Sequence, residues 1–212
     1  PHQQEPLAFG TRPDDDRWTA FVAGTRMAFI SVQADEAEYY TKIESKQEQT
    51  KLAQGLPNVG DSSKSNKREA ETVARLIHTL CQLYSRSGIP FSPCKQIGII
   101  VPFRAQIAMI RKALAERHIP DTADITIDTV ERYQGSQRDI IIFSTTVSRP
   151  YQLSILSEPV MTDGREIDRK LNVALTRARK QFFMTGNETL LRNCTAYRKF
   201  LDFLSKEQIL RL

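Results

Sequence analysis

The sequence predicts an α/β protein with a mainly parallel sheet that carries helices on both of its faces. The apolar run at 97–101 is followed by a short turn and an amphipathic helix at 106–117, which together make half of a parallel βαβ unit. Two further runs have the character of strands, since 125–130 alternates in polarity and 140–144 is almost entirely apolar. The 212 residues suffice for one substantial domain with an insertion.

The N-terminal part of the chain divides into a lead-in, a first strand and a polar segment. Residues 1–25 contain three prolines, two glycines and an acidic run, so we expect an irregular lead-in with little regular structure. The domain then covers 26–212 and opens with an apolar strand at 27–32. Residues 33–60 are polar and charged, which predicts a surface insertion; a mobile linker is the alternative.

Three later segments complete the expected order of elements. A helix begins near 62–70, where Ser or Asn caps it and Glu69 falls in its first turn. Residues 148–165 contain two prolines and a glycine, so we expect a loop. A last helix at 196–204 has apolar residues at helical spacing and is expected to pack on the sheet.

Residues 168–180 predict a helix that turns directly into a strand at 181–185. Apolar side chains recur at helical spacing, and Arg177 lies off the face that they form. The apolar face comprises Leu171, Ala174, Leu175 and Ala178. A helix that passes straight into a strand holds its last arginines at the edge of the sheet, where α/β proteins bind ligands.

The charge of the chain is unevenly distributed. The formal net charge is +5, with six basic and nine acidic residues in 1–60 but 24 basic and 16 acidic residues in 61–212. A basic body favours a polyanionic partner, first of all a nucleic acid.

Cysteine and histidine usage gives no sign of a disulfide framework or a metal site. Cys81, Cys94 and Cys194 are odd in number and form no CxxC pair, so an intracellular compartment is expected, cytoplasm or nucleus. No apolar run approaches the roughly 20 residues of a membrane helix. Because Pro1 is not a start methionine, we expect a fragment or a processed form.

The string Leu-Asn-Val-Ala-Leu-Thr-Arg-Ala-Arg at 171–179 closely resembles the last motif of superfamily 1 helicases. It is most similar to the branch that holds the nonsense-mediated-decay RNA helicase and the replication helicase-nuclease. The resemblance implies a RecA-like fold, 5′ to 3′ polarity, and a catalytic arginine, Arg177, that reaches the γ-phosphate of ATP. A surface helix with solvated arginines is the alternative.

A second motif covers 129–139, Thr-Val-Glu-Arg-Tyr-Gln-Gly-Ser-Gln-Arg-Asp, and is similar to the TVDxFQGxExD signature of the same family. The resemblance implies that Thr129 contacts the backbone of a bound strand, and that Gln134, Gly135 and Gln137 face the nucleotide and its ribose. Gln137 stands where the family has glutamate, so the sugar contact would be made by an uncharged amide. A glycine-containing turn between two strands is the alternative.

A third stretch, Pro102-Phe103-Arg104-Ala105-Gln106, resembles the TPYRAQ turn of these helicases. There the turn meets a nucleic-acid phosphate, which implies that Pro102, Phe103, Arg104 and Gln106 contribute to strand binding. The placement has a physical reason, because a helix N-terminus offers free N–H groups and the positive end of a dipole. The spacing of Ser63, Asn66 and Glu69 is also similar to the family, although an ordinary helix cap explains it.

The chain lacks the parts that would make it a complete motor. None of its nine glycines is followed by lysine, so no P-loop exists, and we expect no ATP turnover by this chain alone. The resemblance therefore implies the C-terminal RecA-like domain of a helicase. Its ATP and Mg²⁺ site would be completed by a first RecA-like domain outside this chain, and its other partner would be single-stranded DNA or RNA. The alternative is a non-catalytic module derived from a helicase that binds nucleic acid or protein.

Overall fold

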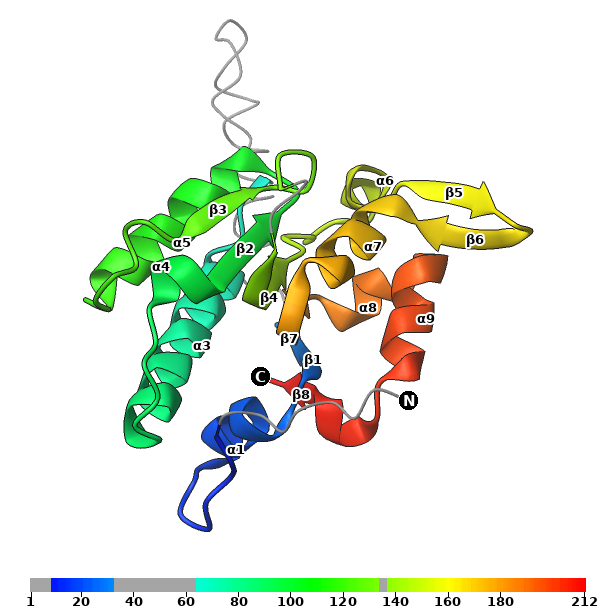
Figure 1. Ribbon diagram of the computed structural model, residues 1–212. Helices are drawn as coiled ribbons and strands as arrows, with labels where there is room; N and C mark the ends of the chain where they lie inside the picture. Colours follow the sequence, from blue (N-terminus) through cyan, green and yellow to red (C-terminus); the bar gives the residue numbers. More distant parts are fainter. Residues whose placement is uncertain (1–8, 33–63, 134–136) are drawn as a thin grey trace, which may run out of the picture.

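The computed structural model describes residues 9–32, 64–133 and 137–212, and it confirms the predicted α/β fold. A six-stranded sheet has the order β3-β2-β4-β7-β1-β8, and every neighbouring pair is parallel (Figure 1). The expected polar insertion at 33–60 lies outside the described residues. The strands are β1 (Met27–Ser31), β2 (Ile97–Val101), β3 (Thr126–Thr129), β4 (Arg138–Ser144), β7 (Ala178–Gly186) and β8 (Ile209–Arg211).

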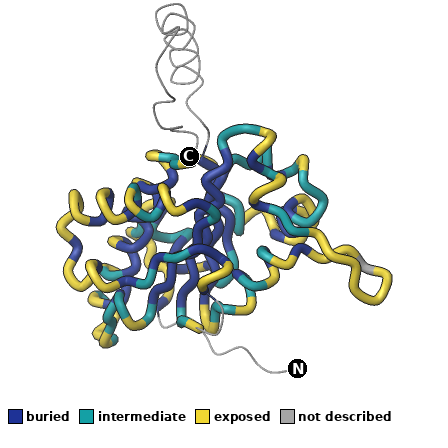
Figure 2. Tube along the Cα trace, turned by 90° about the horizontal axis from the view of Figure 1, so that it is seen from above, coloured by how far each residue is buried: buried dark blue, intermediate teal, exposed yellow. Residues whose placement is uncertain are grey.

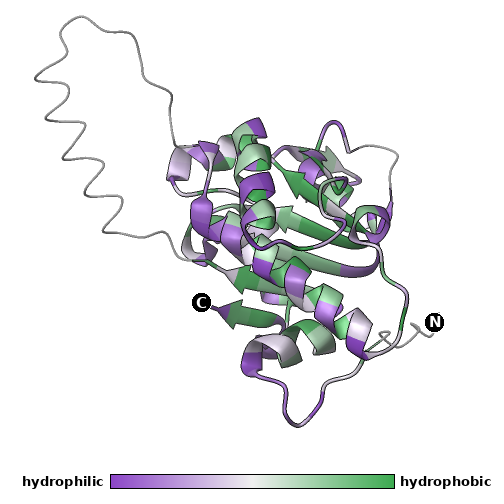
Figure 3. Ribbon diagram, turned by 90° about the vertical axis from the view of Figure 1, so that its left-hand side faces the viewer, coloured by the Kyte–Doolittle hydropathy of each residue, from purple (hydrophilic) through white to green (hydrophobic). Residues whose placement is uncertain are grey.

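Helices cover both faces of the sheet, as the sequence predicts. One group packs on the face that contains Ile99 and Ile142, and the other packs on the face that contains Ile100 and Phe143. Because successive strand residues point to opposite faces, both faces contribute to a core. Figure 2 shows the resulting buried centre, and Figure 3 shows that the strands are predominantly hydrophobic. The first group comprises α1 (Arg17–Gly24), α3 (Lys67–Arg86), α4 (Pro93–Gln96) and α5 (Arg104–Glu116); the second comprises α6 (Leu153–Leu156), α7 (Arg169–Thr176), α8 (Glu188–Leu191) and α9 (Thr195–Phe203).

The lead-in at 1–25 differs from the expectation, because it contains the helix α1. The side chain of Asp16 caps this helix and accepts a hydrogen bond of 2.6 Å from the N–H of Thr19. Trp18 is buried against α3, where its indole N–H donates to the Thr79 hydroxyl at 2.8 Å. Capping and the burial of one large aromatic side chain thus stabilise a helix in a segment whose prolines and glycines suggested none.

The segment 148–165 was expected to be a loop, and this prediction is wrong. It contains a 3-10 turn (Pro150–Gln152), α6 and a β-hairpin formed by β5 (Pro159–Thr162) and β6 (Arg165–Asp168). The hairpin turn is Asp163-Gly164, and both residues have positive φ, +50° and +72°. Asp-Gly turns of this kind match the twist of antiparallel strands. The pair Asp163-Gly164 is therefore a local sequence signal for a hairpin within a segment whose prolines and glycine otherwise suggest a loop.

The predicted helix at 168–180 is shorter than expected. α7 ends at Thr176, Arg177 is its C-cap, and Ala178 already belongs to β7. The carbonyl of Arg177 accepts a hydrogen bond of 3.0 Å from the N–H of Arg138, the first residue of β4. The helical propensity of the sequence would allow the helix to continue, but backbone pairing with β4 ends it at Thr176.

Tyr133, four residues after the end of β3, packs on one face of the sheet. It is buried, and its ring lies over Gly98 of β2. A side chain at position 98 would have its Cβ 1.8 Å from the Tyr133 hydroxyl oxygen, so glycine is required there. This close approach holds Tyr133 against β2.

Candidate nucleic-acid and nucleotide site

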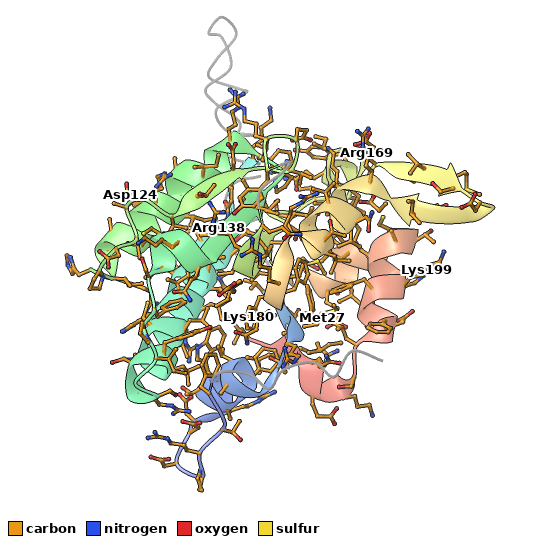
Figure 4. The ribbon with its side chains drawn as sticks, in the orientation of Figure 1. Met27, Asp124, Arg138, Arg169, Lys180 and Lys199 are labelled. Carbon is orange, nitrogen blue, oxygen red and sulfur yellow. The ribbon has the colours of Figure 1, made fainter. Side chains whose placement is uncertain are left out.

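The structure places the predicted site residues at two opposite edges of the sheet. Val101 and Thr129 are register partners in the parallel pair β2–β3, and α5 begins at Arg104, so Arg104 and Thr129 share the carboxyl edge. Gln137 and Arg177 immediately precede β4 and β7, so they share the amino edge. Figure 4 labels Arg138 and Lys180, which stand at the beginnings of the same two strands. Arg177 therefore lies at the edge opposite to the one where open α/β sheets usually bind ligands.

At the carboxyl edge, the turn at 102–104 presents one free cation. Phe103 is buried and Pro102 is half-buried, whereas Arg104 is exposed at the first position of α5. Arg104 has no hydrogen-bond or ion-pair partner within the described part of the chain. Thr129 is largely buried beside this turn. An exposed guanidinium next to the N-terminus of a 13-residue helix suits an anionic group such as a phosphate.

Gln106 does not lie at the surface, so its side chain is not placed for the direct contact with a bound strand that the motif implies. Its side chain is fully buried, and its amide makes two hydrogen bonds with the backbone of Asn66. The carbonyl oxygen accepts from the Asn66 N–H at 2.7 Å, and the Nε2 group donates to the Asn66 carbonyl at 3.1 Å. The same Nε2 group also donates to Ser144 at 3.3 Å. In this structure Gln106 joins α5 to the N-cap of α3.

The carboxylate of Glu69, in the first turn of α3, accepts hydrogen bonds through both of its oxygens. It is fully buried, and its Oε2 atom accepts three hydrogen bonds from the ends of β4 and β7. The donors are the Ser144 hydroxyl at 2.8 Å, the Thr146 N–H at 3.1 Å and the Thr185 hydroxyl at 3.0 Å. The other oxygen, Oε1, accepts from the Asn66 side chain at 3.2 Å.

Burial and hydrogen bonding act on Glu69 in opposite directions. Removal from water raises the pKa of the carboxyl to about 7, although the bonds from Thr146, Ser144 and Thr185 favour the charged form. The sequence indicated a helix cap at Asn66 and Glu69, with a spacing similar to that of the helicase family, but it assigned no contacts to these residues. The structure shows that they connect α3, α5, β4 and β7 through Gln106 and the strand ends.

At the amino edge, the fold brings together Gln137 and Arg177, which are 40 residues apart in sequence. Arg138 and Arg179, which sequence reasoning missed, stand beside them. Arg138 donates to the Gln137 carbonyl at 3.0 Å and to the Thr126 hydroxyl at 3.3 Å, and Arg179 donates to the Gln137 side chain at 3.4 Å. Gln134 and Gly135 lie outside the described residues.

An irregularity in the pairing of β4 with β7 explains the position of Arg179. Arg138 pairs with Ala178 but Ile140 pairs with Gln181, so β7 holds one extra residue between these pairs. Such a bulge re-aims the side chains that it contains, and a sequence pattern of period two does not reveal it. The neighbouring Lys180 is neutralised by Asp139 at 2.9 Å, which leaves Arg177 and Arg179 without an acidic partner among the residues described.

Two guanidinium nitrogens at this edge lack partners. The Nε atoms of Arg138 and Arg177 are buried and make no hydrogen bond to any described group. Unsatisfied buried donors are costly, so an anion that accepts from them would be stabilised at this edge. These residues therefore fit a nucleotide phosphate. Within the described ranges, no group of three His, Cys, Asp or Glu side chains is placed to hold a metal ion.

None of the described helices combines the length and the apolar character that crossing a bilayer requires.

The fold and the two edges define a helicase-type domain with a RecA-like sheet. Residues 14–189 match the sequence profile described as "AAA domain", and the chain belongs to this family. It is similar to the chicken (Gallus gallus) protein named putative helicase MOV-10, with 32% identity over 155 residues, which is 67% of this chain and 15% of that protein.

Two further relatives carry helicase names. The DNA polymerase alpha-associated DNA helicase A of Saccharomyces cerevisiae is 34% identical over 103 residues, 48% of this chain and 14% of that protein. The bovine (Bos taurus) DNA replication ATP-dependent helicase/nuclease DNA2 is 31% identical over 139 residues, 65% of this chain and 12% of that protein. The chain is a superfamily 1 helicase-type domain, and the matches span 12 to 15% of these relatives' lengths.

The buried carboxyl of Glu69 leads to a prediction about pH. The folded-state pKa of about 7 exceeds the ordinary 4.5, so the stability that protonated Glu69 contributes is complete below pH 4.5 and is lost as the pH rises through 7. The shift corresponds to about 3 kcal/mol in the free energy of unfolding. Denaturant unfolding from pH 4.5 to 8 should show this decline in the wild type and a flatter profile in Glu69→Gln. The same dependence of the unfolding free energy on pH in both proteins would contradict the attribution of the decline to Glu69.

Proposed function

We propose that the chain is the C-terminal RecA-like motor domain of an ATP-dependent superfamily 1 helicase that acts on single-stranded DNA or RNA. The observation that carries the proposal is the position of Arg177 immediately before β7, where its carbonyl accepts from the N–H of Arg138, the residue after Gln137, at 3.0 Å. The buried Nε atom of Arg177 lacks a partner among the described groups. The helicase names of the relatives support the proposal. The ATP and Mg²⁺ site would be completed by a first RecA-like domain of the same protein, inside the cell.

In this proposal the amino edge faces the nucleotide. Arg177 supplies positive charge to the γ-phosphate as negative charge develops in the transition state. Gln134, Gly135 and Gln137 border the base and the ribose. Arg138 positions this border, because it binds the Gln137 carbonyl and the Thr126 hydroxyl at the same time. Bound ATP with Mg²⁺ would supply the phosphoryl group that water attacks.

The carboxyl edge forms part of the track for the strand. Arg104 and the first N–H groups of α5 hold a phosphate, and Thr129 with the Pro102-Phe103 turn completes the surface. Contacts of this kind carry no sequence preference, which suits a motor that moves along a strand. Gln106 acts indirectly, since its buried amide fixes the start of α5 against the start of α3.

The second candidate function is a non-catalytic module that binds nucleic acid or protein. Gln137 favours it, because a neutral amide replaces the glutamate of the family motif. Substitution of Arg177 separates the two functions, since only a motor depends on this side chain for turnover.

We expect Arg177→Ala in the full-length protein to reduce ATP turnover roughly 10³–10⁵-fold, which is about 4–7 kcal/mol of barrier. Arg177→Lys should rescue turnover poorly, because an ammonium group cannot reproduce the planar guanidinium. Arg198→Ala is the matched control, since Arg198 is exposed on α9 and lies outside both edges. The measurements are kcat, melting temperature and strand affinity.

The melting temperature and the strand affinity of Arg177→Ala should stay close to those of Arg198→Ala. A loss of turnover below about tenfold would rule out the proposed role of Arg177. A larger loss that merely follows a collapse of the melting temperature would count against it equally.

We expect this chain to bind single-stranded oligonucleotides with an affinity that falls steeply with salt. Arg104→Ala should weaken binding to all sequences alike and lower the slope of log K against log salt by about 0.7, the contribution of one phosphate contact. Fluorescence anisotropy over a salt series measures this, with Arg198→Ala as the control. An unchanged slope in Arg104→Ala, or wild-type binding that is independent of salt, would show that Arg104 does not contact a phosphate of the strand.

A further inference from the structure

The β5–β6 hairpin and the short turn and helix that precede it carry a concentration of exposed apolar side chains. Seven large apolar side chains are exposed in the described part of the chain, and five of them lie within residues 151–167, where they are 36 to 70% exposed. Two of the five, Val160 and Ile167, are register partners on one face of the hairpin. Grouped apolar exposure of this kind marks a binding surface more often than single exposed residues do. The five are Tyr151, Ile155, Val160, Met161 and Ile167.

The hairpin is a preformed element that is fixed at its base. The carboxylate of Asp168 is buried and accepts hydrogen bonds from the Ser157 hydroxyl at 2.6 Å, the Glu158 N–H at 2.7 Å and the Leu171 N–H at 2.7 Å. It thereby joins both strands of the hairpin to the first turn of α7. A rigid element loses little conformational entropy when it binds a partner.

Both outer edges of the hairpin offer unpaired backbone groups. β5 and β6 pair only with each other among the strands that the structure describes. Figure 1 and Figure 2 show the hairpin extending away from the main sheet. An exposed strand edge is a template for a further strand, and extended peptides bind many domains in this way.

The charge of the hairpin disfavours a nucleic acid and favours a basic partner. Residues 158–167 contain three acidic residues and one basic residue, whereas the whole chain has a net charge of +5. Glu158 is paired with Arg169 at 3.4 Å, so Asp163 and Glu166 are the acidic side chains that the argument uses. Acidic side chains beside an apolar pair would repel phosphates but complement lysine or arginine.

We propose that the β5–β6 hairpin binds an extended segment of a partner protein whose side chains alternate between apolar and basic, and that this segment adds to the hairpin as a third strand. The apolar side chains of the segment pack on Val160 and Ile167, and its basic side chains face Asp163 and Glu166. This interaction is separate from the proposed motor function, because it uses neither edge of the main sheet.

The test uses the full chain and a fluorescein-labelled ten-residue peptide of alternating valine and lysine. We expect saturable binding by fluorescence anisotropy, and an affinity at least about tenfold lower for the double variant Val160→Ser with Ile167→Ser. Phe203→Ser is the matched control, since Phe203 is also an exposed apolar residue but lies on α9, and it should leave the affinity unchanged.

A second peptide tests the strand pairing itself and needs no protein variant. The same peptide with N-methyl groups on alternate backbone amides retains the side chains but cannot pair along its length, and it should bind at least about tenfold more weakly. Three results would overturn the proposal: no saturable binding up to about 1 mM peptide, equal binding of the N-methylated peptide, or equal binding by the double serine variant. Loss of oligouridylate affinity in that variant would assign the hairpin to nucleic acid instead.

Discussion

The buried carboxylate of Glu69 joins the parts of the domain that form its carboxyl edge. One oxygen accepts from the ends of β4 and β7, and the other accepts from Asn66, whose backbone is held by Gln106 of α5. A buried charge without these donors would be strongly destabilising, so the donors and the carboxylate require one another. The start of α5, and with it the exposed Arg104, is therefore fixed relative to the main sheet by a network that contains no exposed group.

The two edges divide the proposed work of the domain, and the chain connects them directly. Thr129 lies at the carboxyl edge, the ring of Tyr133 packs over Gly98 of β2, and Gln137 lies at the amino edge. Because Arg138 binds both the Thr126 hydroxyl and the Gln137 carbonyl, the start of β4 is attached to β3 at the amino edge.

The sequence predicted five of the six strands of the main sheet, because these are short runs of strand length and polarity bounded by turn signals. It did not predict β8, a three-residue strand at the C-terminal end. It also predicted that Gln137 and Arg177 belong to one site, through motifs rather than through geometry. It did not predict that pairing with β4 ends α7 at Thr176, that a bulge aims Arg179 at Gln137, or that Gln106 is buried. These features depend on contacts between distant segments, which local propensity and periodicity do not contain. The β5–β6 hairpin differs from these features, since the Asp163-Gly164 pair at its turn is a local signal that is visible in the sequence.

The proposed action of Arg177 on the transition state of ATP hydrolysis is tested most directly by differential binding of two ligands. The affinity of the full-length protein and of Arg177→Ala should be measured for ADP and for ADP with aluminium fluoride, which mimics the transferring phosphoryl group. We predict that Arg177→Ala binds ADP almost as well as the wild type but loses at least about 100-fold in affinity for the analogue. Equal losses for the two ligands, or no loss for the analogue, would contradict it.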